Sequence, residues 1–208
     1  AALYLPISGW WGALIAMLIG TVCGGLYALL PAVLNAKFNV TLVICTLMLN
    51  YVANYITYYF VSFPLKDNTG DGLMAKTLTI DQSMWLPRMG WLKGSTFHLG
   101  FFIAVAVVFL ILFLMKRTVF GYESRMSGLN RDFAEYGGVK RVKVMYITMF
   151  LSGALCALGG AIEVLGLKLL YLHDMLKSPS YAWTGLMAAL ISNLNPIGIL
   201  FCSIFLAG

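Results

Sequence analysis

The sequence predicts an all-α membrane protein, built as a bundle of helices that crosses the bilayer several times. The 208 residues are 61% hydrophobic and 11% charged, whereas soluble domains are about 45–50% apolar and about 25% charged. Several apolar runs approach the roughly 20 residues that a helix needs to cross the hydrocarbon core. The charges gather between these runs, above all in residues 117–143. We therefore expect one transmembrane domain over residues 1–208.

The apolar runs predict four spanning helices, at residues 10–34, 40–63, 98–115 and 144–167. Polar, turn-rich connectors over 64–97 and 168–180 separate the second helix from the third and follow the fourth. Small residues recur at every fourth position from Gly12 to Ala36, and a shorter stripe comprises Gly153, Ala157 and Ala161. Such stripes let helix backbones approach closely, so we expect tight packing along these two helices.

The C-terminal region is predicted to contain an interrupted helix. An apolar run over 181–194 stops at Asn195-Pro196, and another begins at residue 197. Both runs are shorter than a full span. Interrupted helices at membrane depth occur where they are buried in protein or line a cavity. We therefore expect a broken or re-entrant helix around 181–198.

The charged segment sets the orientation. Seven basic and three acidic residues lie between Lys116 and Lys143, and basic connectors face the cytoplasm. The connector 117–143 is therefore predicted to be cytoplasmic, and the connectors 64–97 and 168–180 extracellular. Because this topology accounts for half of the fourteen basic residues, the net charge of +6 indicates a bilayer and not nucleic acid as the partner.

A short helix is predicted inside the cytoplasmic connector. Asn130 is a favourable N-cap, Asp132 lies in the first turn, and Gly137-Gly138 can close the C-terminal end. Phe133 and Tyr136 are three residues apart and share a helix face. An exposed, capped helix on this side is a candidate docking element for a cytosolic protein.

Five polar residues fall at membrane depth: Asn50, Asn54, Glu163, Asn193 and Asn195. Inserting a charged carboxylate at that depth costs about 2.5–3.5 kcal/mol on insertion scales, unless a partner or water offsets the cost. Two interpretations stay open for these side chains. They form hydrogen bonds between helices, or they line a hydrated substrate path.

No signature of enzyme chemistry is present. The sequence has no phosphate-binding loop, no H-E-x-x-H, no G-x-S-x-G and no G-x-G-x-x-G. The four cysteines and two histidines have no metal-ligand spacing. We therefore expect no catalytic residue, metal or cofactor on this chain, and any ATP-driven work to belong to another polypeptide.

Several motifs resemble one family. The segment from Gly121 to Val139 and the run L-S-G-A-L-C-A-L-G-G-A-I-E-V-L-G that ends at Gly166 are similar to the permease subunits of bacterial ABC importers for simple sugars and nucleosides. T-L-M-L-N-Y-V-A at 46–53 resembles the nucleoside-type members, and N-P-I-G at 195–198 resembles their N-P-x-G turn. The family's chains are longer, so the abrupt ends at Ala1 and Gly208 predict a permease domain truncated at both ends.

The resemblance implies a multi-pass subunit of the bacterial cytoplasmic membrane that imports a nucleoside or a simple sugar. It implies a second permease subunit, identical or different, an extracellular substrate-binding lipoprotein and a cytosolic ATPase that holds ATP and Mg²⁺. The helix 130–136 would couple to that ATPase through Asn130, Arg131, Asp132, Phe133, Ala134, Glu135 and Tyr136. An alternative is a secondary transporter that uses Glu163 for ion coupling, and a channel-like or structural membrane protein is a third class.

Overall fold

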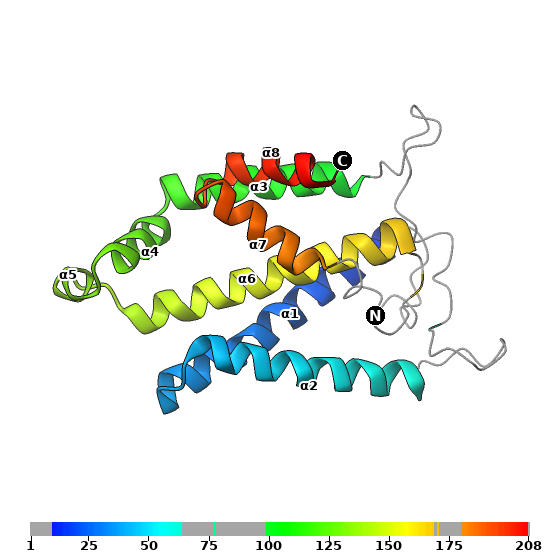
Figure 1. Cartoon of the computed structure of the whole chain (residues 1–208), viewed down its shortest axis with the longest axis horizontal. Coiled ribbons are helices and arrows are strands. Elements are labelled where there is room, and N and C mark those ends of the chain that lie inside the picture. Colours follow the sequence, from blue (N-terminus) through cyan, green and yellow to red (C-terminus); the bar gives the residue numbers. More distant parts are fainter. Residues whose placement is uncertain (1–9, 64–76, 78–98, 169, 171–179, 208) are drawn as a thin grey trace. The chain divides into compact units, whose positions relative to one another are not determined.

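The computed structural model describes residues 10–63, 77, 99–168, 170 and 180–207. In this part of the chain every extended regular element is a helix, apart from a single bridge residue at Thr77, so the all-α prediction is confirmed. The elements are α1 (Trp10–Phe38), α2 (Leu42–Ser62), α3 (Gly100–Arg117), α4 (Val119–Leu129), α5 (Arg131–Tyr136), α6 (Arg141–Glu163) with the π-helical turn η2 (Val164–Lys168), α7 (Tyr181–Ile191) and α8 (Pro196–Ala207) (Figure 1). The predicted connectors 64–97 and 168–180 lie almost entirely outside the described residues.

Three described segments are long and apolar enough to cross a membrane: Trp11–Phe38, Gly100–Arg117 and Arg141–Gly166. They correspond to three of the four predicted spans. The fourth, α2, has 21 residues, which gives a length of about 30 Å. It is long enough to span, but two asparagines and four tyrosines interrupt its apolar sequence, and it is not among the three candidate spans.

Two helix ends differ from the predicted boundaries. α1 extends to Phe38 instead of ending near residue 34. Asn39 then takes a left-handed conformation (φ 53°), which asparagine tolerates, and the Asn35 side-chain amide donates to the Val40 carbonyl at 2.7 Å. α6 begins at Arg141 instead of 144 and passes into η2 after Glu163.

The described chain forms two compact units. The first comprises Ala1–Gly100 with Met145–His173, and the second Phe101–Val144 with Asp174–Gly208. In the first unit, α1 and α6 cross where small residues meet. A Cβ on Gly153 would lie 2.6 Å from the Gly24 carbonyl oxygen, and a Cβ on Gly24 would lie 3.0 Å from the Gly153 carbonyl oxygen. These two glycines therefore permit backbone-to-backbone contact, as the small-residue stripes predicted.

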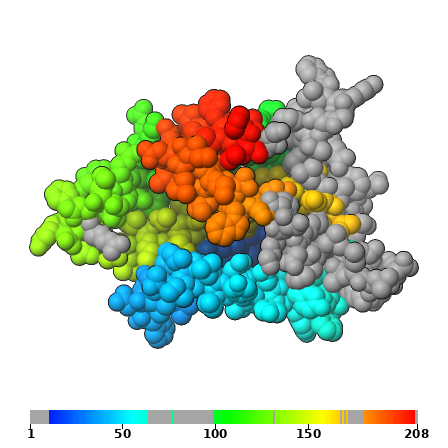
Figure 2. Space-filling model, viewed as in Figure 1, coloured from blue at the N-terminus to red at the C-terminus, as the bar shows by residue number. Residues whose placement is uncertain are grey.

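α2 lies against α1 in the same unit. The Tyr27 hydroxyl donates to the Leu49 carbonyl at 2.7 Å, and Cys45 is buried on α2. The bond joins a side chain of one helix to the backbone of the next. It places a polar group inside the protein, where hydrogen bonding offsets the cost of burial. Many other side chains of α2 are exposed, although Val61 is also buried, and Figure 2 shows part of α2, in cyan, at the surface of the visible face.

In the second unit, a single threonine joins α3 to α4. The Thr118 hydroxyl donates to the Leu114 carbonyl of α3 and accepts from the Gly121 N–H of α4 at 3.3 Å. A Cβ on Gly121 would lie 2.5 Å from the Leu114 carbonyl oxygen. Glycine at 121 therefore lets α4 start directly at the end of α3.

Candidate functional site

The N-terminal end of α5 is formed by Asn130. Its side-chain Oδ1 accepts hydrogen bonds from the N–H groups of Asp132 at 3.1 Å and Phe133 at 3.2 Å. Its own N–H donates to the Met126 carbonyl at 3.1 Å. Asn130 therefore ends α4 and caps α5, so only one non-helical residue separates the two helices. Asp132 adds a negative charge in the first turn, where the helix dipole favours it.

The C-terminal end of α5 is a Schellman motif. The Gly138 N–H donates to the Glu135 carbonyl and the Val139 N–H to the Ala134 carbonyl, both at 3.0 Å. Gly138 has φ +81°, a left-handed conformation that side chains disfavour and glycine accepts freely. The predicted N-cap and the predicted closure by Gly137-Gly138 are both confirmed.

The side chains of α5 divide between one buried position and an exposed surface. Ala134 is 2% exposed, whereas Phe133 is 61% and Tyr136 is 93% exposed. Asp132 and Glu135 are also exposed, and the side chain of Arg131 lies outside the described part of the chain. Figure 2 shows α4 and α5, in light green, at the surface of the visible face. The helix thus presents two aromatic rings with acidic neighbours.

The predicted helix break lies between α7 and α8. The Asn193 N–H donates to the Leu190 carbonyl at 3.1 Å and the Leu194 N–H to the Ala189 carbonyl at 2.9 Å, which is again a Schellman closure. Asn193 (φ 51°) and Leu194 (φ 60°) are both left-handed. The predicted interruption is confirmed, and α7 and α8 are each shorter than a span.

The residue that starts α8 is Asn195. Its Oδ1 accepts from the Ile197 N–H at 3.2 Å, and Pro196 occupies the first helical position, where a missing N–H costs nothing. Close packing across the turn follows from Gly198, whose Cβ, if present, would lie 2.8 Å from the Ser192 Cβ. Asn193 and Asn195 therefore shape the break through capping, and a contact with substrate stays a prediction for both.

The other three candidate path residues belong to the first unit. Asn50 is exposed and Asn54 half-buried, one turn apart on α2. Glu163 is half-buried and is the last residue of α6 before the π-helical turn, a kind of irregularity often found at functional sites. Asn193 and Asn195 lie in the second unit. A role of these five residues in a substrate path stays a prediction.

Sequence reasoning overlooked the tyrosines of α2. Tyr51, Tyr55, Tyr58 and Tyr59 are all exposed, and the spacing of 51, 55 and 58 by four and three residues places them on one helix face. That spacing is visible in the sequence and could have identified the face. The π-helical turn η2 has no comparable sequence signal.

These features define a multi-pass helical membrane protein whose basic connector holds a short, exposed helix with a cap at each end. The chain belongs to the family described as the branched-chain amino acid transport system permease component, which it matches over residues 1–208. It is therefore a transport subunit of the ABC permease type.

Relatives with assigned roles support the same class. The guanosine ABC transporter permease protein NupP of Bacillus subtilis is 30% identical over 93% of this chain and 55% of its own length. The nucleoside ABC transporter permease protein NupB of Lactococcus lactis is 29% identical over 67% of this chain and 38% of its own length. The glucose ABC transporter permease protein TsgB13 of Haloferax volcanii is 28% identical over 72% of this chain and 40% of its own length.

The chain thus spans between 38% and 55% of the length of these curated relatives. No solved structure is significantly similar to it.

Proposed function

We propose that this chain is the permease subunit of an ATP-driven importer of nucleosides or simple sugars in the bacterial cytoplasmic membrane. Two of the relatives named above are permeases for nucleosides or guanosine, and one is a permease for glucose. ATP and Mg²⁺ bind to a separate cytosolic ATPase, with no cofactor on this chain. A second permease subunit completes the membrane path, and an extracellular lipoprotein delivers the substrate.

The observation that carries the proposal is the construction of α5. A helix of 6 residues is far below the roughly 12–15 residues that an isolated helix needs in water. Here a side-chain cap at one end and a Schellman motif at the other hold it in place. Such local reinforcement of a helix with an exposed surface is what a docking element requires, because a preorganised element loses less entropy on binding.

The two exposed rings of α5 provide the anchor for the ATPase. Phe133 and Tyr136 would insert into a groove on the ATPase, with Asp132 and Glu135 at the rim. Aromatic anchors at the centre of an interface typically contribute about 2 kcal/mol or more on truncation to alanine. Movement of the ATPase on ATP binding then shifts α5, and α5 passes the shift through Asn130 and α4 to the end of α3, where Thr118 and Gly121 join the two helices.

The test is a Phe133→Ala, Tyr136→Ala double variant of the full-length permease, expressed with its ATPase. We expect the ATPase to be lost from pull-downs or its hydrolysis to become independent of substrate, while membrane insertion stays normal. Insertion depends on the apolar spans and their flanking basic residues, which these substitutions leave unchanged.

The matched control is Phe109→Ala. Phe109 is 65% exposed on the spanning helix α3, so this variant removes a ring of similar exposure from outside the connector. Normal pull-down and normal substrate-stimulated hydrolysis in the double variant would refute the coupling role of α5. Equal losses in the control would show that the effect is not specific to α5.

A further inference from the structure

α2 combines the length of a membrane span with several polar side chains. It has 21 residues, yet it is not among the three described segments that are apolar enough to cross a membrane by composition. Its centre lies near residue 52, so Asn50 and Tyr51 fall in the middle of the bilayer if the helix spans it. Hydrocarbon offers no partner to amide or hydroxyl groups at that depth. Some part of α2 must therefore face protein or water.

One side of α2 is already covered by α1. Cys45 is buried there, and the Tyr27 hydroxyl donates to the backbone carbonyl of Leu49. The tyrosines lie elsewhere on the helix: Tyr51 is 60% and Tyr55 is 75% exposed. Because 51, 55 and 58 follow a spacing of four and three residues, their rings form one stripe.

An amide lies beside this stripe. Asn54 is three residues after Tyr51 and four before Tyr58, so it is adjacent to both on the helix surface. Asn50 lies one turn before Asn54. Within the described part of the chain, the side chains of Asn50, Asn54, Tyr51 and Tyr55 make no hydrogen bonds. Tyr51 and Tyr55 thus present flat apolar rings, and the amides of Asn50 and Asn54 beside them make no hydrogen bond within the described residues.

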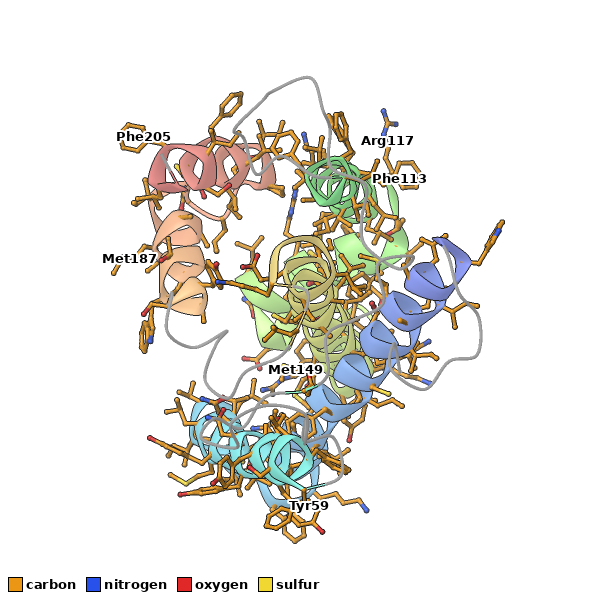
Figure 3. All side chains as sticks on the ribbon, turned by 90° about the vertical axis from the view of Figure 1, so that its right-hand side faces the viewer. Tyr59, Phe113, Arg117, Met149, Met187 and Phe205 are labelled. Carbon is orange, nitrogen blue, oxygen red and sulfur yellow. The ribbon has the colours of Figure 1, made fainter. Side chains whose placement is uncertain are left out.

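Interfacial anchoring accounts only for the aromatic residues at the C-terminal end of α2. Tyrosine is enriched where the membrane meets water, and Tyr59 lies at the C-terminal end of α2 with its ring 5.2 Å from that of Phe63. Figure 3 shows the Tyr59 ring on the outer side of α2. Tyr51 lies more than two turns further into the span, where an anchoring role does not apply. In the predicted orientation, the stripe runs from the extracellular end of α2 to mid-membrane.

We propose that the stripe of Tyr51, Tyr55 and Tyr58, with Asn50 and Asn54 beside it, lines the translocation path and contacts a solute that carries a planar heterocycle, as a nucleoside does. A base stacks on aromatic rings without regard to its identity, and an asparagine amide matches the donor and acceptor pair on a base edge. Successive rings along the helix offer successive stacking positions. This inference rests on the proposed function, and within it commits to a nucleoside as the solute, with a simple sugar as the alternative that the experiment separates.

Accessibility to a charged thiol reagent tests whether the stripe lines a hydrated path. Tyr51→Cys and Tyr55→Cys are made in the full-length permease after its native cysteines are replaced by alanine. The matched control is Ile56→Cys, which is also exposed but lies away from the stripe on the same helix. We expect a membrane-impermeant methanethiosulfonate reagent to label positions 51 and 55 and to spare 56, and guanosine to slow the labelling at least several-fold.

Three outcomes would overturn the proposal. Absence of labelling at 51 and 55 would mean that lipid, a second copy or a further part of the permease covers the stripe. Labelling that guanosine does not slow would mean a hydrated face without nucleoside contact. Protection by glucose and not by guanosine would show that the proposal names the wrong class of solute.

Transport kinetics in the assembled complex provide the second measurement and need no cysteine replacement. Tyr51→Ala should raise the KM for guanosine about tenfold, as loss of one stacking contact does, and Tyr51→Phe should retain most of the wild-type KM. ATPase association and basal hydrolysis are measured on the same preparations. If the wild-type complex does not assemble with an ATPase, the proposed function fails. If it assembles and hydrolyses ATP but Tyr51→Ala leaves the KM unchanged, only the stripe assignment fails.

Discussion

Replacing Gly138 with alanine adds a single methyl group and should destabilise the C-terminal end of α5. A Cβ on Gly138 meets nothing within 4 Å, so alanine fits sterically. The difficulty is the backbone: Gly138 holds φ +81°, and a left-handed conformation costs an L-residue about 1–2 kcal/mol. The Schellman bonds of Glu135 and Ala134 depend on this conformation. Gly138→Ala should therefore weaken the C-terminal end of α5 by that amount.

Gly128 is the matched control for this substitution. A Cβ there also meets nothing within 4 Å, but Gly128 lies inside α4 with an ordinary helical backbone. Alanine in a helix interior is about 1 kcal/mol more favourable than glycine. The two variants add the same group to the same connector, and their effects should have opposite sign and differ by about 2–3 kcal/mol.

The assay is hydrogen exchange of the backbone N–H groups of Gly137, Gly138 and Val139 in the purified permease. Because 1.4 kcal/mol corresponds to a factor of ten in an equilibrium constant, we expect Gly138→Ala to speed exchange about tenfold. Gly128→Ala should leave exchange at these positions unchanged or slower. Equal exchange rates in the two variants would refute the role of the Schellman motif in ordering α5.

Other substitutions test the helix crossing, the intramembrane carboxylate and the helix break. Gly153→Ala places a Cβ 2.6 Å from a carbonyl oxygen of α1 and should lower the thermal midpoint in detergent by overpacking of about 1–3 kcal/mol, whereas Gly159→Ala meets nothing within 4 Å and should not. Glu163→Gln should reduce substrate uptake while the complex still assembles; failure to assemble would make the residue structural. Asn193→Gly should keep the wild-type thermal midpoint and Asn193→Ala should lower it, because position 193 is left-handed; loss of uptake in a stable Asn193→Gly variant would instead indicate that the amide contacts solute.

Local chemistry made much of this chain predictable. The caps of α5 depend on Asn130, Gly137 and Gly138, which lie within one short segment, and their hydrogen bonds join neighbours in sequence. The helix break at Asn195-Pro196 is local for the same reason: proline cannot continue a helix, and asparagine caps the next one. Spanning segments follow from composition and length, since hydrocarbon demands about 20 apolar residues whatever the neighbours are.

The candidate path residues were predictable only as a set of polar positions. Sequence places Asn50 and Asn54 on one helix face and identifies Glu163 as a carboxylate within an apolar run. It does not indicate that α6 changes to a π-helical turn directly after Glu163. It also does not indicate that Asn193 takes a left-handed backbone conformation at the end of α7.

The sequence by itself determined the class of protein, the order of its helices and the two ends of α5, because these depend on composition and on contacts between near neighbours. Only the tertiary structure decided which small residues meet, as Gly24 and Gly153 do, and which face of α2 is covered by α1 through Tyr27 and Cys45. A stripe of small residues offers several equivalent registers to a partner helix. The choice among them depends on how distant side chains fit together in space, and periodicity along the chain does not contain that information.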